Sequence, residues 1–145
     1  NIRLAKINLL FPYINKTLTA YKKYYVKPEI ISEERILSVA WFKYGKYDIK
    51  DEFKQISEHI AQIHKENPNK KIKIVGHTDT KCSDALNNAL SIRRANALAK
   101  IFYKLGVKKS QIIKIEGKGE KQLIYPKEYN EYEMQANRRV DIVFI

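Results

Sequence analysis

Between residues 36 and 116, short β-branched runs alternate with longer segments of helical periodicity. The run 36–42 has the length and composition of a strand, residues 71–75 alternate lysine with apolar side chains, and residues 111–116 form a third run. A last alternating run closes the chain at Val140, Ile142 and Phe144. The order strand, helix, strand, helix, strand and final strand predicts an α/β fold, built as a two-layer α/β sandwich.

The first helical segment follows the turn at Gly45 and ends before Pro68. Asp48 is the expected N-cap, because a short acidic side chain can accept hydrogen bonds from the first free amides of a helix. The apolar positions recur every three or four residues, as in a half-buried helix. They are Ile49, Phe53, Ile56, Ile60 and Ile63.

A second helix is expected from Asp84, as its cap, to the residue before Gly106, a residue type that suits the position after a last helical turn. Its expected apolar stripe is Leu86, Leu90, Ala97, Leu98, Ile101 and Leu105. Residues 125–136 are predicted to form a short helix or an ordered loop, with Pro126 in the first helical position.

A length of 145 residues predicts one domain, and 44% hydrophobic with 30% charged residues is the composition of a globular protein. No apolar run has the roughly 18 residues of a transmembrane helix. The net charge of +12 leaves two explanations open. One is a polyanionic partner, such as nucleic acid, an anionic membrane surface or a carboxylate-rich polymer; the other is a lysine-rich, solubilising surface.

The chemistry-bearing residue types predict a binding module rather than an enzyme. Cys82 has no second cysteine to pair with, and three scattered histidines do not suggest a zinc site. No Ser-His-Asp, Cys-His or paired-carboxylate arrangement stands out. The sequence therefore predicts no catalytic residue, no metal and no cofactor.

Residues 76–95 place an acid and a base across one predicted strand-turn-helix corner. Asp79 lies in the turn and Arg94 on the helix, a pair suited to holding a zwitterion. A simple turn aspartate and a surface arginine are the alternatives. Asn87 lies seven residues before Arg94, on the same helix face, where it could bind a ligand or hold the 77–83 loop.

Three blocks carry a family resemblance: GHTDT at 76–80, Asn87 with LSIRRA at 90–95, and ANRRVDI at 136–142. Together they resemble OmpA-like peptidoglycan-binding domains, found in outer-membrane protein A, the peptidoglycan-associated lipoprotein and flagellar motor protein B. The resemblance covers 35–145 and implies a βαβαβ-type mixed sheet with a C-terminal strand. Residues 1–34 are then an N-terminal extension packing on the domain, and their role in covering the pocket, in homodimerisation or in inert support stays open.

The resemblance also implies a ligand, the meso-diaminopimelate stem peptide of peptidoglycan. Asp79 would bind its side-chain ammonium and Arg94 its carboxylate. The full expected ligand-binding set is Asp79, Arg94, Asn87, Thr78 and Arg139. The function implied is non-catalytic anchoring of an envelope protein or assembly to the cell wall. A basic nucleic-acid-binding domain is the alternative, weakened by the scatter of the basic residues.

The implied location is the Gram-negative periplasm. Because the chain begins at Asn1 without a signal-peptide pattern, we expect a segment outside it to supply the tether to the outer or inner membrane. The chain departs from the family pattern at Gly45, where the lipoprotein branch has a ligand-contacting aspartate. It also departs at Cys82 and Leu86, where glycine and tyrosine are common. These departures predict altered pocket walls around Asp79 and Arg94.

Overall fold

The computed structural model describes residues 35–145. In this part of the chain four strands form one mixed sheet, in the spatial order β1-β4-β2-β3. They are β1 (Ile36–Trp41), β2 (Ile72–Gly76), β3 (Ile112–Gly117) and β4 (Arg139–Phe144). The last strand, β4, lies between β1 and β2 and runs antiparallel to both, whereas β2 and β3 are parallel. The expectations for residues 1–34, including dimerisation, fall outside the described residues.

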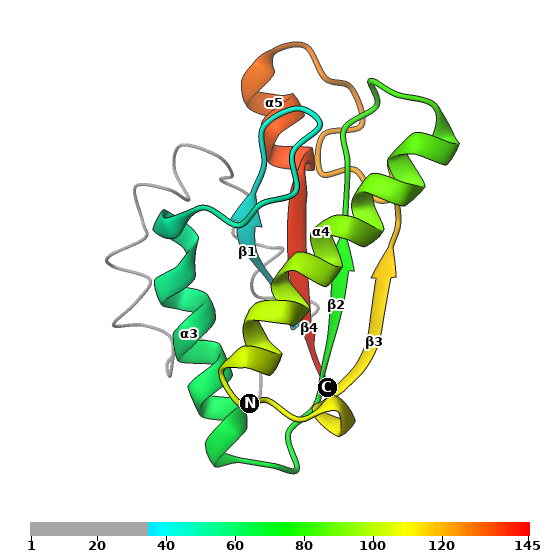
Figure 1. Ribbon diagram of the computed structural model, residues 1–145. Coiled ribbons are helices and arrows are strands. Elements are labelled where there is room, and N and C mark those ends of the chain that lie inside the picture. Colours follow the sequence, from blue (N-terminus) through cyan, green and yellow to red (C-terminus); the bar gives the residue numbers. More distant parts are fainter. Residues whose placement is uncertain (1–34) are drawn as a thin grey trace.

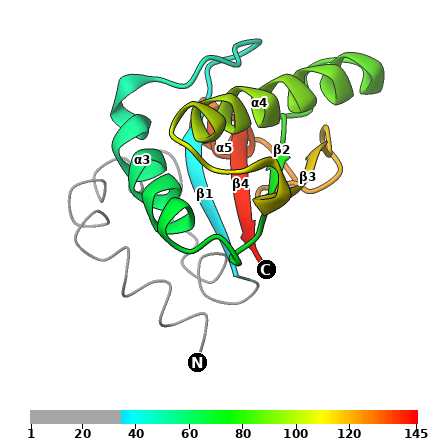
Figure 2. The same cartoon turned by 60° about the horizontal axis from the view of Figure 1, so that its bottom comes forward.

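Two long helices, α3 (Asp51–Glu66) and α4 (Asp84–Lys104), cover one face of this sheet (Figure 1). A short 3-10 helix, η1 (Lys109–Gln111), leads into β3, and α5 (Glu131–Asn137) precedes β4. The view turned by 60° shows the helices in a layer of their own against the strands (Figure 2). The predicted two-layer α/β sandwich with a C-terminal strand is therefore confirmed.

The core fills the space between these two layers. Trp41 from β1 meets Phe53 from α3 with ring centroids 5.5 Å apart, which joins the first strand to the first long helix. The most deeply buried apolar side chains come from both layers, as the alternation in the strands predicts. They include Ile60, Ile72, Ile74, Leu98, Phe102, Val140 and Ile142.

Helix α4 lies unusually close to the sheet because two strands end in glycine. A Cβ atom on Gly76 would stand 1.8 Å from the main-chain oxygen of Ser91, and one on Gly117 would stand 2.3 Å from the Ser91 hydroxyl. No side chain fits either gap, since real Cβ contacts are not this short. The two glycines therefore let the middle of α4 rest directly on the ends of β2 and β3.

This close approach explains why the expected apolar stripe of α4 is only partly right. Leu98 is buried as expected, but the Leu86 side chain is 63% exposed. Small and polar residues occupy the inner face toward the N-terminal half of the helix, where it nears the glycines. The buried residues of α4 are Asn87, Ser91, Arg94, Ala95, Leu98, Ala99 and Phe102.

The predicted helix starts are wrong by one to several residues. Helix α3 begins at Asp51 with Lys50 as N-cap, so Asp48 does not cap it. Ser83, not Asp84, caps α4, its hydroxyl accepting from the Leu86 amide at 3.3 Å. Helix α5 begins after the cap residue Asn130, and Pro126 lies in the preceding loop. The predicted stop at Gly106 is confirmed, with its φ at +98°.

Candidate functional site

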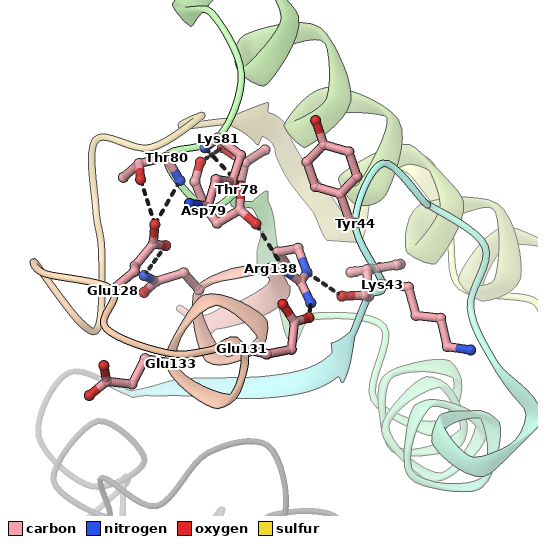
Figure 3. Close-up of polar contacts among 12 residues, drawn as sticks. Lys43, Tyr44, Thr78, Asp79, Thr80, Lys81, Glu128, Glu131, Glu133 and Arg138 are labelled. Atoms are coloured by element: carbon pink, nitrogen blue, oxygen red, sulfur yellow. Dashed lines mark hydrogen bonds and ion pairs between the residues drawn. The ribbon is translucent and has the colours of Figure 1, made fainter.

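The candidate site lies at one end of the sheet, where β1, β2 and β3 end and β4 begins. The antiparallel register places the start of β4 beside the ends of both β1 and β2, through the pairs Trp41–Arg139 and Gly76–Val140. The turn after β1, the 77–83 loop after β2 and the end of α5 therefore meet there (Figure 3). Residues far apart in sequence become neighbours at this end of the sheet.

Asp79 is a buried carboxylate in this corner, with 3% of the residue exposed. Its Oδ2 accepts from Nη1 of Arg138 at 2.9 Å, and its Oδ1 accepts from the Lys81 amide at 3.1 Å. These two bonds hold both carboxylate oxygens in place. Asp79 is thus a side chain of fixed orientation rather than a freely rotating turn residue.

Arg94 is fully buried, at 0% exposure, and faces the same corner from α4. Its Nε donates to the Lys46 carbonyl and its Nη1 to the His77 carbonyl, both at 2.8 Å, while Nη2 reaches the Lys43 carbonyl at 3.4 Å. The Phe42 ring lies 4.9 Å from its Cζ. Burial lowers the pKa of Arg94 to about 10, against the opposing charge of Asp79, so the guanidinium stays positive at neutral pH.

Both charged groups keep capacity for a further partner. A guanidinium has five N–H donors, and three of those on Arg94 are used among the described residues, which leaves two. Each Asp79 oxygen accepts one hydrogen bond, although a carboxylate oxygen has two acceptor positions. The protein fixes the positions of Asp79 and Arg94 but leaves part of their hydrogen-bonding capacity unused.

Arg138, rather than Arg139, reaches Asp79. Its guanidinium also donates to the Phe42 carbonyl at 2.8 Å and to the Glu131 carboxylate. Arg139 instead donates to the Asp141 carboxylate at 3.2 Å and to two main-chain carbonyls of the neighbouring loop and helix. Sequence reasoning expected Arg139 at the border of the site. Neighbouring side chains in extended backbone point to opposite faces, so Arg138 and Arg139 are expected on opposite faces. The sequence does not show which of the two faces the site.

Asn87 and Thr78 shape the 77–83 loop. The Asn87 amide donates to the Asp79 carbonyl at 3.3 Å and the Cys82 carbonyl at 3.1 Å, tying the loop to α4. The Thr78 hydroxyl donates to the Asp79 carbonyl at 2.9 Å, and the Thr78 amide to the Gly119 carbonyl at 2.9 Å. Both side chains are thus directed at main-chain atoms of the loop.

Tyr44 and Cys82 link two loops across the corner. The Tyr44 hydroxyl lies 3.1 Å from the Cys82 sulfur, although the Tyr44 residue is 57% exposed. This hydrogen bond raises the pKa of Tyr44, and the negative charge of Asp79 adds to the effect. Gly45, next to Tyr44, adopts a φ of +69°, in the left-handed region that glycine tolerates best. Two of the three departures from the family pattern, Gly45 and Cys82, therefore belong to this link.

A second buried cluster supports the site from the opposite face of the sheet. Nε2 of His77 lies 3.2 Å from Oδ2 of Asp141, whose Oδ1 accepts from the Ser38 hydroxyl at 2.6 Å. Burial alone would raise the pKa of Asp141, but Arg139, His77 and Ser38 hold it well below its usual range. Burial, with Arg139, lowers the pKa of His77. The His77 side chain is therefore neutral at pH 7. The main-chain carbonyl of the same residue accepts a hydrogen bond from Arg94.

Sequence reasoning missed the acidic residues that brace the site. Glu131 pairs with Arg138, and Glu128 accepts from the Thr80 hydroxyl and from the Asn137 amide at 2.7 Å (Figure 3). Both come from the stretch between β3 and β4, where no periodic pattern marks them. Their partners lie 7 to 48 residues away in sequence, so only the fold brings them together.

Residues 35–145 contain no group of three or more His, Cys, Asp or Glu side chains that could hold a metal ion. None of the helices in this range combines the length and apolarity needed to cross a bilayer.

Comparison with known proteins places this geometry in a family. The curated peptidoglycan-associated lipoprotein of Legionella pneumophila is 33% identical over 84 residues, which is 58% of this chain and 47% of the relative. The chain thus spans about half the length of that relative. Among solved structures, the peptidoglycan-associated lipoprotein from Burkholderia pseudomallei is 27% identical, with a TM-score of 0.71 over 77% of this chain and 90% of that one.

Two further solved structures share the fold at lower identity. The C-terminal domain of Helicobacter pylori MotB is 24% identical, with a TM-score of 0.66 over 75% of this chain and 84% of that one. The cell wall anchor of the T6SS from Pseudomonas aeruginosa is 19% identical, with a TM-score of 0.68 over 93% and 96%. The model of the OmpA family matches residues 41–138, which include Asp79, Arg94 and Arg138. The resemblance expected from the three sequence blocks is confirmed, and the chain belongs to the OmpA family.

Proposed function

We propose that this domain binds the diaminopimelate-containing stem peptide of peptidoglycan, without catalysis. The observation that carries the proposal is the meeting of Asp79 and Arg94 in one buried corner, both with unused hydrogen-bonding capacity. The relatives named as peptidoglycan-associated lipoproteins support the same ligand. The proposal of peptidoglycan binding rests on the buried pair and on the relatives. The proposed specificity for diaminopimelate rests on the Asp79–Arg94 pair alone.

The chemistry of diaminopimelate matches this pair. The end of its side chain carries an ammonium and a carboxylate, which are the counterparts of a carboxylate and a guanidinium. Asp79 takes the ammonium, and the two spare N–H groups of Arg94 take the carboxylate. Each charge-assisted bond of this kind contributes about 1.5–3 kcal/mol. A low-dielectric corner strengthens both bonds, since little water competes for the charges.

The remaining residues of the expected set take supporting roles in this proposal. Asn87 and Thr78 hold the loop that carries Asp79, and Arg138 orients the Asp79 carboxylate. Arg139 acts from the opposite face, by fixing Asp141 beside His77.

In the cell, we propose that the domain anchors an envelope protein or assembly to the wall from the periplasm, through a tether outside this chain. Weak binding at one site is sufficient, because the wall presents many identical sites at once. The nucleic-acid alternative rests on the net charge alone and gains no support from the family. Increasing salt separates the two, since nucleic-acid binding falls steeply with salt concentration.

Co-sedimentation with purified diaminopimelate-type sacculi tests the proposal. Wild-type protein should pellet with the sacculi, and Asp79→Asn should weaken binding about tenfold to a hundredfold, as expected for one lost charge-assisted bond. Glu58→Gln is the matched control, because it removes the same charge from an exposed residue in the middle of α3.

Thermal unfolding of each variant checks that the domain remains folded at the assay temperature. Wild-type-like pelleting of folded Asp79→Asn would remove Asp79 from the binding site. Failure of the wild-type protein to pellet would overturn the proposed function itself.

A further inference from the structure

Beside the Asp79–Arg94 corner, the segment joining β1 to α3 lines an open cavity of about 280 Å³. Three of its five lining residues are lysines and one is an aspartate, so the lining carries a net charge of +2 (three positive, one negative) at neutral pH. The lining residues are Phe42, Lys43, Lys46, Asp48 and Lys50. The volume suits an amino-acid-sized group, at the small end of ligand pockets.

The cavity and the proposed ligand pair share a wall. Arg94 donates to the carbonyls of Lys43 and Lys46, and its guanidinium lies over the Phe42 ring. Arg138 holds the same segment through the Phe42 carbonyl at 2.8 Å. Two buried arginines therefore fix the backbone from which the side chains of Lys43 and Lys46 project.

The three lysines are not neutralised by their neighbours. Other lysines in the described part of the chain form ion pairs, such as Lys54 with Asp51 and Lys114 with Glu116. No ion pair within residues 35–145 engages Lys43, Lys46 or Lys50. Unpaired lysines that line one cavity attract an anionic group more strongly than the same charges scattered over a surface.

We propose that this cavity is a second subsite, which takes another carboxylate of the same stem peptide. The inference rests on the proposed function, because it assumes that Arg94 holds the diaminopimelate residue next door. A carboxylate suits the site, since lysine ammonium groups act as point charges and need no fixed bidentate geometry. The subsite would let the domain read a neighbouring acidic residue as well as the zwitterion.

A triple variant separates the subsite from the charge pair. Lys43→Met, Lys46→Met and Lys50→Met together remove the three charges and keep the main-chain carbonyls that hold Arg94. The control is Lys100→Met, Lys104→Met and Lys109→Met, which removes the same charge from exposed positions on α4 and η1.

Two soluble probes are titrated against each protein. One is a diaminopimelate-containing stem peptide with all carboxylates free, and the other is the same peptide with every carboxylate amidated except that at the diaminopimelate side-chain end. Wild type and control should bind the free acid about two- to fivefold more tightly than the amide, as expected for partly exposed charge pairs. The triple variant should lose this preference for the free acid. Asp79→Asn should weaken the binding of both peptides and leave the preference unchanged.

Equal affinity of wild type for the two peptides would overturn the subsite and leave the proposed function standing. Retention of the preference by the triple variant would also overturn the subsite and leave the proposed function standing. Absence of wild-type binding to either peptide would overturn the proposed function and the subsite together. Should the triple variant unfold, the single variants Lys43→Met and Lys46→Met should each reduce the preference, and an unchanged preference in both would also overturn the subsite.

Discussion

Asp79 is almost out of contact with water, accepts a hydrogen bond from Arg138 and interacts electrostatically with Arg94. Stability alone gives little reason for such an arrangement, because the desolvation of buried charges offsets much of their attraction. A ligand with charges of both signs supplies a reason, since it finds its counter-charges already oriented. Replacing either arginine would also remove the hydrogen bonds that it donates to main-chain carbonyls, so the isosteric change Asp79→Asn is the cleaner probe.

His77 makes the domain sensitive to mild acid. Its pKa is lowered by burial, and Nδ1 has no hydrogen-bond partner in the described structure, so a second ring proton is unfavourable in the fold. The unfolded chain takes up that proton below pH about 6.5, whereas the folded chain does not. The free energy of unfolding should therefore decrease as pH falls below about 6.5, by up to about 1.4 kcal/mol per pH unit.

Denaturant unfolding at a series of pH values measures this slope. His77→Gln should flatten it between pH 5 and 6.5, and His59→Gln controls for the loss of a histidine as such. The lowered pKa of Asp141 adds a separate loss below about pH 4, because the unfolded chain then binds a proton that the fold resists. An unchanged slope in His77→Gln would show that other groups carry the acid sensitivity.

At the scale of elements, the contact of α4 with the ends of β2 and β3 positions Arg94 over the corner. Gly76→Ala should therefore destabilise the domain by more than about 3 kcal/mol, because the new methyl group would collide with the Ser91 carbonyl on the helix backbone. Gly45→Ala is the matched control. It meets no atom within 4 Å, and only its φ of +69° opposes it, at about 1–2 kcal/mol.

Urea unfolding of the two glycine variants gives the comparison directly. A loss from Gly76→Ala no larger than that from Gly45→Ala would show that α4 can shift without consequence. Such a result would weaken the claim that this packing fixes the position of Arg94.

The elements were predictable where a single period dominates the sequence. The alternating strands and the periodic α3 depend on local patterns, and both were found close to the predicted ranges. The cap of α4 was missed by one residue because Ser83 and Asp84 are both suitable cap residues, and that of α3 was missed because no side chain caps this helix. The inner face of α4 was missed because its polar residues are satisfied by main-chain partners from distant segments.

The candidate site was predictable in part for the same physical reason. Asp79 and Arg94 lie within one strand-turn-helix corner, so their spacing suggested a pair, and the family resemblance favoured that pair over a turn aspartate and a surface arginine. Arg138, Glu131 and the carbonyls of the turn after β1 join them only through the sheet, in which β4 is inserted between β1 and β2. No local pattern encodes that insertion, which explains why Arg139 was favoured over Arg138.

At the scale of the whole molecule, the mixed sheet gathers every loop of the proposed site at one edge. The net charge of +12 then favours approach to an anionic polymer over long distances, and the buried corner is proposed to supply the selectivity. Long-range attraction should weaken with salt, whereas the recognition of a zwitterion in a low-dielectric corner is screened much less. The two contributions are thus separable in one molecule.

The most direct test of this account is calorimetric titration of the protein with two stem peptides, one containing meso-diaminopimelate and the other lysine at the same position. Lysine has the ammonium but lacks the side-chain carboxylate that Arg94 is proposed to bind. We expect the diaminopimelate peptide to bind at least about tenfold more tightly, the equivalent of one charge-assisted hydrogen bond. Equal affinities for the two peptides would contradict the proposed role of the Asp79–Arg94 corner.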